Sequence, residues 1–196
     1  MTRKYGQSGF SLIEMLTVIG ITGAIATFAL PSVSRTSEDL RLSNDGRAIA
    51  QLVGVVKMRA ASKFSRARLF VALDDNTYYT QYWDRPTNSW ITEGGTTELS
   101  HGVRFGFGDL DTPPPDSQVA IAQAPACTDD GGGAIGNSAC IMFNSRGIPI
   151  DSVGAPTGGN AIYLTNDVGV FATTLTATPL VRLWWSPANT AAWVSQ

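Results

Sequence analysis

Residues 9–31 read GFSLIEMLTVIGITGAIATFALP, and this stretch decides the fold. From Phe10 to Leu30 there are 21 residues, and Glu14 is the only charged residue among them. An apolar helix of about 20 residues is long enough to span the hydrocarbon core of a bilayer. A carboxylate inside such a span costs roughly 2.5–3.5 kcal/mol at mid-membrane and less near its end. The segment therefore predicts a transmembrane helix whose Glu14 needs a partner, which favours assembly with other chains.

The nine residues before the span carry two charges, Arg3 and Lys4, and both are positive. The positive-inside rule places this end in the cytoplasm and the rest of the chain outside. A secretory signal peptide has its small-residue cleavage site after the apolar region. Here Gly9 comes before that region, so cleavage at Gly9 would remove the basic leader and leave the apolar helix on the mature protein.

Residues 9–31 resemble the N-terminal signature of type IV prepilins and type II secretion pseudopilins. In that family a membrane peptidase cuts after the glycine and methylates the new N-terminus, which implies cleavage between Gly9 and Phe10 and methylation of Phe10. Glu14 matches the family's assembly glutamate, which implies a contact with the Phe10 amine of an adjacent subunit. Gly23 and Pro31 match positions where many members have glycine and proline. The alternative interpretation is an ordinary anchor helix with a stray glutamate.

The helix is predicted to continue past the span to about residue 64. Pro31 lacks an N–H and Gly23 lowers helix propensity, so a kink is expected in this region. Further along, apolar residues recur at intervals of 7, 4, 3 and 4, which is a helical stripe suited to packing on a sheet. The stripe consists of Leu42, Ile49, Val53, Val56 and Ala60.

The remaining residues, 67–196, show short runs rich in β-branched and aromatic residues, separated by turn signals such as Asp74-Asp75-Asn76. Strands are expected at Leu69–Leu73, Tyr78–Trp83, Ser89–Thr92, Val103–Phe107, Gln118–Ala122, Ile141–Asn144, Ala161–Thr165, Gly169–Leu175 and Val181–Trp185. If Trp184 and Trp185 lie in a strand, they point to opposite faces. One is then expected in the core, and the other is a candidate subunit contact.

The C-terminal half is similar to GspH/FimT-type minor pilins and pseudopilins, at residues 141–149 (IMFNSRGIP), 161–164 and 181–184. This resemblance implies a long helix packed on a two-sheet head. The predicted fold is therefore α+β and pilin-like. A cleaved basic leader (1–9) precedes the transmembrane half (10–30) and the amphipathic half (31–66) of the helix. A β-rich extracytoplasmic head (67–196) follows.

Charge is unevenly distributed along the chain. Residues 35–68 hold eight Lys/Arg and three acidic residues (8 − 3, net +5), whereas residues 69–196 hold four basic and twelve acidic residues (4 − 12, net −8). An acidic head is a poor electrostatic match to nucleic acid. Some FimT-type pilins capture DNA through a Gly-Arg-x-Arg stretch, of which only Arg182 remains here. Arg59, Lys63, Arg66 and Arg182 are the candidates for that alternative, in which the chain is a DNA receptor.

Two cysteines, Cys127 and Cys140, lie on the side predicted to be extracytoplasmic, and an even count there favours a disulfide over two free thiols. They flank Asp129-Asp130-Gly131-Gly132-Gly133, which lacks the regular ligand spacing of a calcium loop and is interpreted as a solvated loop. His101 is the only histidine, and no nucleophile motif accompanies it. No enzymatic activity, cofactor or metal is therefore predicted.

The sequence thus predicts a minor pilin or pseudopilin that initiates or caps a type IV pilus or a type II secretion pseudopilus. The alternatives are a DNA-binding minor pilin for natural transformation and a major fibre subunit. The resemblance implies as partners other pilin subunits, the prepilin peptidase, the inner-membrane assembly platform and membrane lipid. It also implies a single pass through the inner membrane, with a cytoplasmic N-terminus and a periplasmic head that later enters a fibre.

Overall fold

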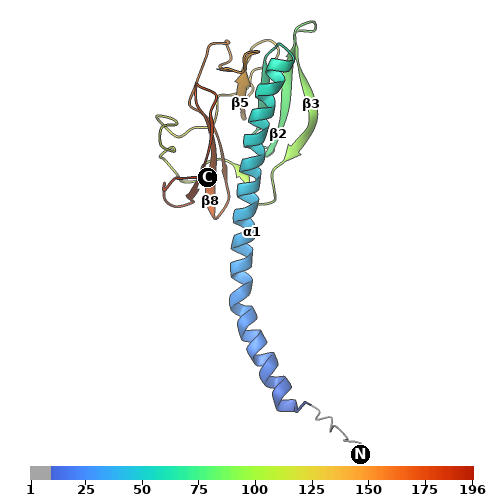
Figure 1. Cartoon of the computed structure of the whole chain (residues 1–196), viewed down its shortest axis with the longest axis vertical. Helices are drawn as coiled ribbons and strands as arrows, with labels where there is room; N and C mark the ends of the chain where they lie inside the picture. The colour runs from blue at the N-terminus through green and yellow to red at the C-terminus, as the bar shows by residue number, and fades with distance from the viewer. Residues whose placement is uncertain (1–9) are drawn as a thin grey trace, which may run out of the picture. The chain divides into compact units, whose positions relative to one another are not determined.

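The computed structural model describes residues 10–196, except for the side chains of 28–34. Within this range the chain forms one long helix followed by strands (Figure 1). The bounds are α1 Leu12–Ser62, β1 Ala67–Ala72, β2 Thr77–Asp84, β3 Ser89–Glu98, β4 Arg104–Phe105, β5 Ser138–Phe143, β6 Pro149–Ile150, β7 Asn160–Thr165, β8 Gly169–Leu175, β9 Val181–Pro187 and β10 Val194–Ser195. The protein is therefore α+β, as predicted.

The chain divides into two compact units, with the boundary between Ser37 and Glu38. The second unit, Glu38–Gln196, is called the head below, and it includes the part of α1 from Glu38 onward. The helix ends two residues before the expected position. Phe64 there adopts φ 50°, and its N–H and that of Ser65 bond back to Ala61 and Ala60. This is the Schellman pattern that terminates helices.

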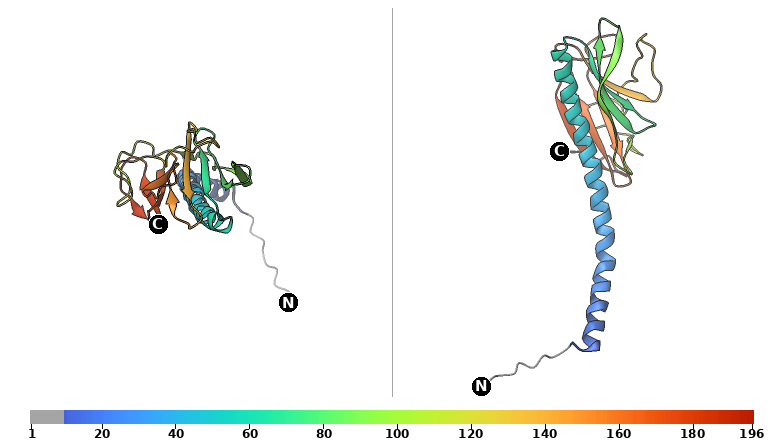
Figure 2. Two further views of the ribbon diagram at one scale, coloured as in Figure 1. Left: turned by 90° about the horizontal axis from the view of Figure 1, so that it is seen from above. Right: turned by 90° about the vertical axis from the view of Figure 1, so that its right-hand side faces the viewer.

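Two antiparallel five-stranded sheets make up the rest of the head (Figure 2). Sheet A has the strand order β3-β2-β1-β5-β6, and sheet B has the order β10-β9-β8-β7-β4. In sheet A, β1 is the central strand, with Ala67 opposite Tyr82 on one side and Phe143 on the other. The predicted two-sheet head is therefore present.

The main core lies between the C-terminal part of α1 and both sheets. The predicted stripe Leu42, Ile49, Val53, Val56 and Ala60 is at most 1% exposed, which confirms it as the buried face of the helix. It packs with Leu69 and Ile141 of sheet A and with Ile162 and Phe171 of sheet B. One apolar stripe thus joins the two sheets, because each sheet alone would leave a hydrophobic face exposed.

Gly46 lets α1 approach sheet B closely. A Cβ atom at this position would lie 2.1 Å from Cδ1 and 2.4 Å from Cε1 of the buried Phe171 ring. The hydroxyl of Thr173 also donates to the Gly46 carbonyl at 3.3 Å. Only a residue without a side chain fits between the helix backbone and this ring.

The outer face of each sheet has its own apolar cover. On sheet B, Tyr163, Ala172 and Trp184 pack with Leu110 and the partly buried Trp193. Trp185 points to the other face, packs on the main core and donates its indole N–H to Asp39 at 3.1 Å. The two tryptophans thus face opposite sides, as predicted, and both are packed within the head.

One predicted strand is wrong: residues 118–122 form no strand. The following residue, Gln123, contacts β7 through its side chain: its amide both donates to the Tyr163 carbonyl and accepts from the Tyr163 N–H, each at 2.9 Å. The Ala124 N–H then bonds to the Ala161 carbonyl at 2.7 Å. The short strands β6 and β10 were not predicted.

Candidate functional site

The start of α1 holds Glu14 in a reciprocal pair with Ser11. The Glu14 carboxylate accepts the Ser11 N–H at 3.1 Å, and the Ser11 hydroxyl accepts the Glu14 N–H at 3.3 Å. This is a capping box, which satisfies two of the N–H groups left free at a helix start. Glu14 therefore has a local structural role in a single chain, in addition to the intersubunit role predicted for it.

The other predicted residues of this segment are open to solvent or lie outside the description. Phe10 is 84% exposed, and no heavy atom lies within 4 Å of a Cβ built on Gly23. Gly9 and the side chain of Pro31 fall outside the described residues, so the cleavage site and the kink stay predictions. Across the described parts of the chain, no helix is both long and apolar enough to cross a membrane. The span over 10–30 also stays a prediction.

The four basic residues considered for DNA do not form one patch. Arg59 makes an ion pair with Glu93 of β3. The Lys63 ammonium lies 4.5 Å from the centre of the Tyr82 ring, and the Arg66 guanidinium 4.7 Å from that of Trp83. Arg182 lies instead in β9 of sheet B. The structure therefore brings Lys63 and Arg66 together at sheet A but separates them from Arg182.

Cys127 and Cys140 form a disulfide, with their Cα atoms 5.0 Å apart. The bridge packs on the outer face of sheet A, against Phe70 and the partly buried Tyr79. These two rings are stacked, with centroids 4.7 Å apart. The predicted disulfide is thus present, and it fastens the glycine-rich loop over an aromatic surface.

Arg68 of β1 also holds the glycine-rich loop, through the Thr128 carbonyl. The sequence did not predict this role. Its side chain is buried, donates to the Thr128 carbonyl at 2.6 Å and to Gln81 at 2.8 Å, and lies 3.8 Å from the centre of the Trp90 ring. Burial lowers the pKa of Arg68 to about 10. A buried cation held by a carbonyl, an amide and an aromatic face is a structural clamp. The one sequence signal for this burial is that Arg68 stands between the apolar residues Ala67 and Leu69 at the start of a strand.

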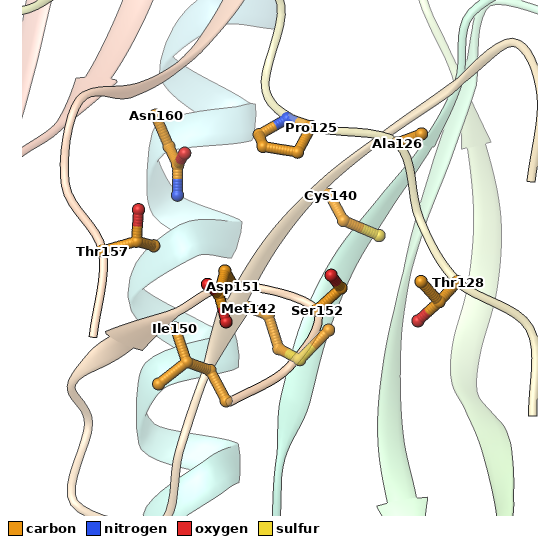
Figure 3. A pocket seen from close by; sticks show the side chains of 10 residues that line it. All are labelled: Pro125, Ala126, Thr128, Cys140, Met142, Ile150, Asp151, Ser152, Thr157 and Asn160. Atoms are coloured by element: carbon orange, nitrogen blue, oxygen red, sulfur yellow. The ribbon is translucent and has the colours of Figure 1, made fainter. Parts of the chain in front are cut away.

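The described residues provide little room for a small molecule in the pocket shown in Figure 3. This pocket lies beside Cys140, Met142 and Asp151 and has a volume of about 20 Å³, close to what one water molecule needs. Within 10–196, moreover, no group of three or more His, Cys, Asp or Glu side chains could hold a metal ion. The Asp129 carboxylate accepts the Gly133 N–H at 2.7 Å, so it closes the glycine-rich turn.

The comparisons with known proteins concern mainly the N-terminal segment. The family described as the prokaryotic N-terminal methylation motif matches residues 4–30. This match confirms that the segment is of the prepilin type. No curated protein matches the chain significantly.

Two solved structures of the minor pseudopilin EpsH, from the type 2 secretion system of Vibrio cholerae, resemble the fold. One has 10% identity and a TM-score of 0.45, covering 76% of this chain and 99% of that one. The other has 12% identity and a TM-score of 0.44, covering 76% and 96%. Identities and scores this low say nothing about activity or partners.

Proposed function

We propose that this chain is a non-enzymatic minor pilin or pseudopilin subunit. It is cut after Gly9, methylated at Phe10 and held in the inner membrane by residues 10–30, with the head in the periplasm. From there it enters a type IV pilus or a type II secretion pseudopilus, which it initiates or caps together with related subunits. Its partners are the prepilin peptidase, the assembly platform, membrane lipid and other pilin subunits.

The observation that carries the proposal is the methylation motif over residues 4–30, with Glu14 as the only charge from Phe10 to Leu30. An unpaired carboxylate is costly in an apolar medium, and a neighbouring subunit's N-terminal amine offsets that cost. A subunit docked beside another is therefore favoured over a lone one. The fold agrees with this role, because a buried helix stripe joins the two sheets into one packed head.

The first test is the mature N-terminus. Mass spectrometry of the membrane-extracted chain is expected to show a protein that begins at methylated Phe10 when the peptidase is present. An intact leader in the same cells would rule out this processing.

The second test separates the two roles of Glu14. Glu14→Gln keeps a side-chain oxygen that can accept the Ser11 N–H, but it removes the charge. Ser11→Ala removes the hydroxyl that accepts the Glu14 N–H and keeps the carboxylate. If the charge serves docking, Glu14→Gln is processed normally yet enters sheared fibres about tenfold less, a loss of ~1.4 kcal/mol. Ser11→Ala assembles nearly as the parent does. The reverse pattern would mean that Glu14 acts only as a helix cap.

A further inference from the structure

One end of sheet A is basic and aromatic. The helix α1 ends here, and β1 begins, because Ala67 is opposite Tyr82 near the end of β2. The turn from β2 to β3 lies at the same end, which is the upper end of the helix in Figure 1. The turn after β5 also lies at this end, because Phe143 is opposite Ala67. The residues concerned, called the basic end below, are Lys63, Phe64, Arg66, Arg85 and Arg146.

Phe64 is the apolar member of the basic end, and its backbone conformation is unusual. It is 76% exposed and occupies, with φ 50°, the helix-terminating position that usually holds glycine. The Arg85 guanidinium donates to its carbonyl at 2.6 Å. A bulky residue with positive φ is uncommon and is maintained only where the surroundings hold it. The exposed ring is therefore presented in a defined place.

The cations around Phe64 are ordered as well, and their charges are available. Lys63 lies over Tyr82, and Arg66 lies 4.7 Å from Trp83 and 5.6 Å from Trp90. No described carboxylate makes an ion pair with any cation of the basic end. Two carboxylates lie at this end, and each accepts hydrogen bonds from neutral groups: Asp84 from Thr87, and Asp130 from the Trp90 N–H. Tryptophan, tyrosine and arginine are the residues enriched where protein interfaces gain most of their energy.

The opposite end of the same strands is acidic. The turn between β1 and β2 holds Asp74 and Asp75, and Glu98 at the end of β3 pairs in register with Thr77. Asp75 and Glu98 are exposed, and their carboxylates make no hydrogen bond or ion pair with any described residue. Asp74 accepts a bond from Asn137. These three carboxylates are called the acidic end.

The acidic end borders an open groove of about 530 Å³. Asp74 and Asp75 line its rim, and the stacked Phe70 and Tyr79 rings line its wall. The groove therefore offers an aromatic surface and two carboxylates side by side. This combination suits an aromatic residue flanked by cations, which is the composition of the basic end.

We propose that the head docks head to tail on a second copy of this chain, with the basic end of one copy in the acidic groove of the next. The proposal rests on the proposed function, because it supplies a contact by which a second copy adds to the subunit that initiates the fibre. β2 separates the two ends by about 24 Å, at 3.3–3.4 Å per residue. When two different patches meet, the first and last subunits of a docked row each keep one patch unoccupied. Further subunits can therefore add to form a filament, unless the rotation between subunits closes the row into a ring. Phe64 is the anchor, and Lys63 and Arg85 meet Asp75 and Glu98.

The test uses the full chain in cells that process it and assemble the fibre, with engineered cysteines. Ala61→Cys marks the basic end and Thr96→Cys the groove, and both positions are exposed. The natural cysteines are joined in the disulfide, so a bismaleimide reacts only at the new sites. When two differently tagged chains are co-expressed, the expected product joins Ala61→Cys to Thr96→Cys. Neither variant is expected to cross-link to itself.

Charge variants then test the electrostatic contact. Arg85→Glu is expected to lower the cross-linking yield at least about fivefold, and Asp75→Arg in the same chain is expected to restore it. Arg85→Gln controls for folding, because it keeps a donor for the Phe64 carbonyl and removes the charge. It is expected to reduce the yield less than Arg85→Glu does. Arg182→Glu, an equal change of charge on sheet B, should leave the yield unchanged.

Several outcomes would overturn the inference. Cross-linking of Ala61→Cys only to a different protein would make that protein the occupant. Salt-sensitive retention of the chain on DNA that Lys63→Glu abolishes would assign the basic end to nucleic acid. Absence of any cross-link, in cells where the chain is cut after Gly9 and enters fibres, would remove the contact and leave the proposed function standing. Failure of that processing would instead count against the proposed function.

Discussion

Replacing Gly46 by alanine tests whether α1 and sheet B are as close as the structure has them. The added Cβ would lie 2.1, 2.4 and 2.7 Å from three atoms of the Phe171 ring. Carbon atoms in contact prefer about 3.5–4.0 Å, so the ring or the helix must move by more than about 1 Å. Phe171 is fully buried, so the ring has no free space to move into. Overpacking of this kind costs typically about 1–3 kcal/mol.

Gly54→Ala is the matched control, because it makes the same substitution in the same helix. Apart from the helix's own neighbouring backbone, no described heavy atom lies within 4 Å of a Cβ built there. Alanine is favoured over glycine in a helix interior by about 1 kcal/mol, and this gain applies to both variants. It cancels in their difference, which leaves the overpacking cost alone. Gly54→Ala is expected to be more stable than the parent, and Gly46→Ala less stable than Gly54→Ala by about 1–3 kcal/mol.

The measurement is guanidinium unfolding of the detergent-solubilised chain, followed by tryptophan fluorescence. All five tryptophans lie between positions 83 and 193, so the signal reports on the head. Phe171→Leu in the same chain should reduce the cost of Gly46→Ala, because a smaller side chain leaves room for the methyl group. Equal unfolding midpoints for the two alanine variants would refute the close approach.

Three further predictions concern the head. Replacing Cys127 and Cys140 together by serine is expected to lower stability by about 3 kcal/mol, since it releases a loop of about 14 residues; the same chain with its disulfide reduced should match it in denaturant unfolding. Arg68→Ala leaves the Thr128 carbonyl without its donor and should cost about 1–3 kcal/mol, with faster proteolysis within the glycine-rich loop as the readout. Burial raises the pKa of Tyr163, so its neutral form is favoured by folding. That contribution is complete below the unfolded pKa of about 10 and is lost as pH rises above it; pH titration of the unfolding midpoint should show a smaller alkaline loss for Tyr163→Phe.

The helix and most strands were predictable because their sequence patterns are local. The stripe from Leu42 to Ala60 repeats at helical spacing, and every member is buried. The strand Gly169–Leu175 was predicted with its observed bounds. Phe64 is different, because its positive φ depends on the distant Arg85 and on the end of the helix rather than on its own residue type.

At the candidate site, prediction reached the disulfide but missed part of the chemistry around Glu14. The Ser11-x-x-Glu14 spacing is a capping-box signal, but it lies inside an apolar run whose length and composition predict a membrane span. Gln123 was unpredictable for another reason. Its amide replaces a neighbouring strand at Tyr163, which depends on the tertiary placement of a loop. In the sequence Arg68 follows Lys63 and Arg66, a basic pattern that is typical of an exposed surface. It is buried because β1 is the central strand of sheet A, which depends on the tertiary fold.

The bond between Asp130 and the Trp90 N–H has a consequence for solubility. β3 is an edge strand of ten residues, and an exposed edge invites pairing with strands of other molecules and aggregation. Asp130 occupies a donor on that edge at 2.9 Å and places a negative charge beside it. Farther along β3, a register shift interrupts the regular ladder. The disulfide-fastened loop therefore covers one donor of this edge, so a strand from another molecule cannot pair there without displacing Asp130.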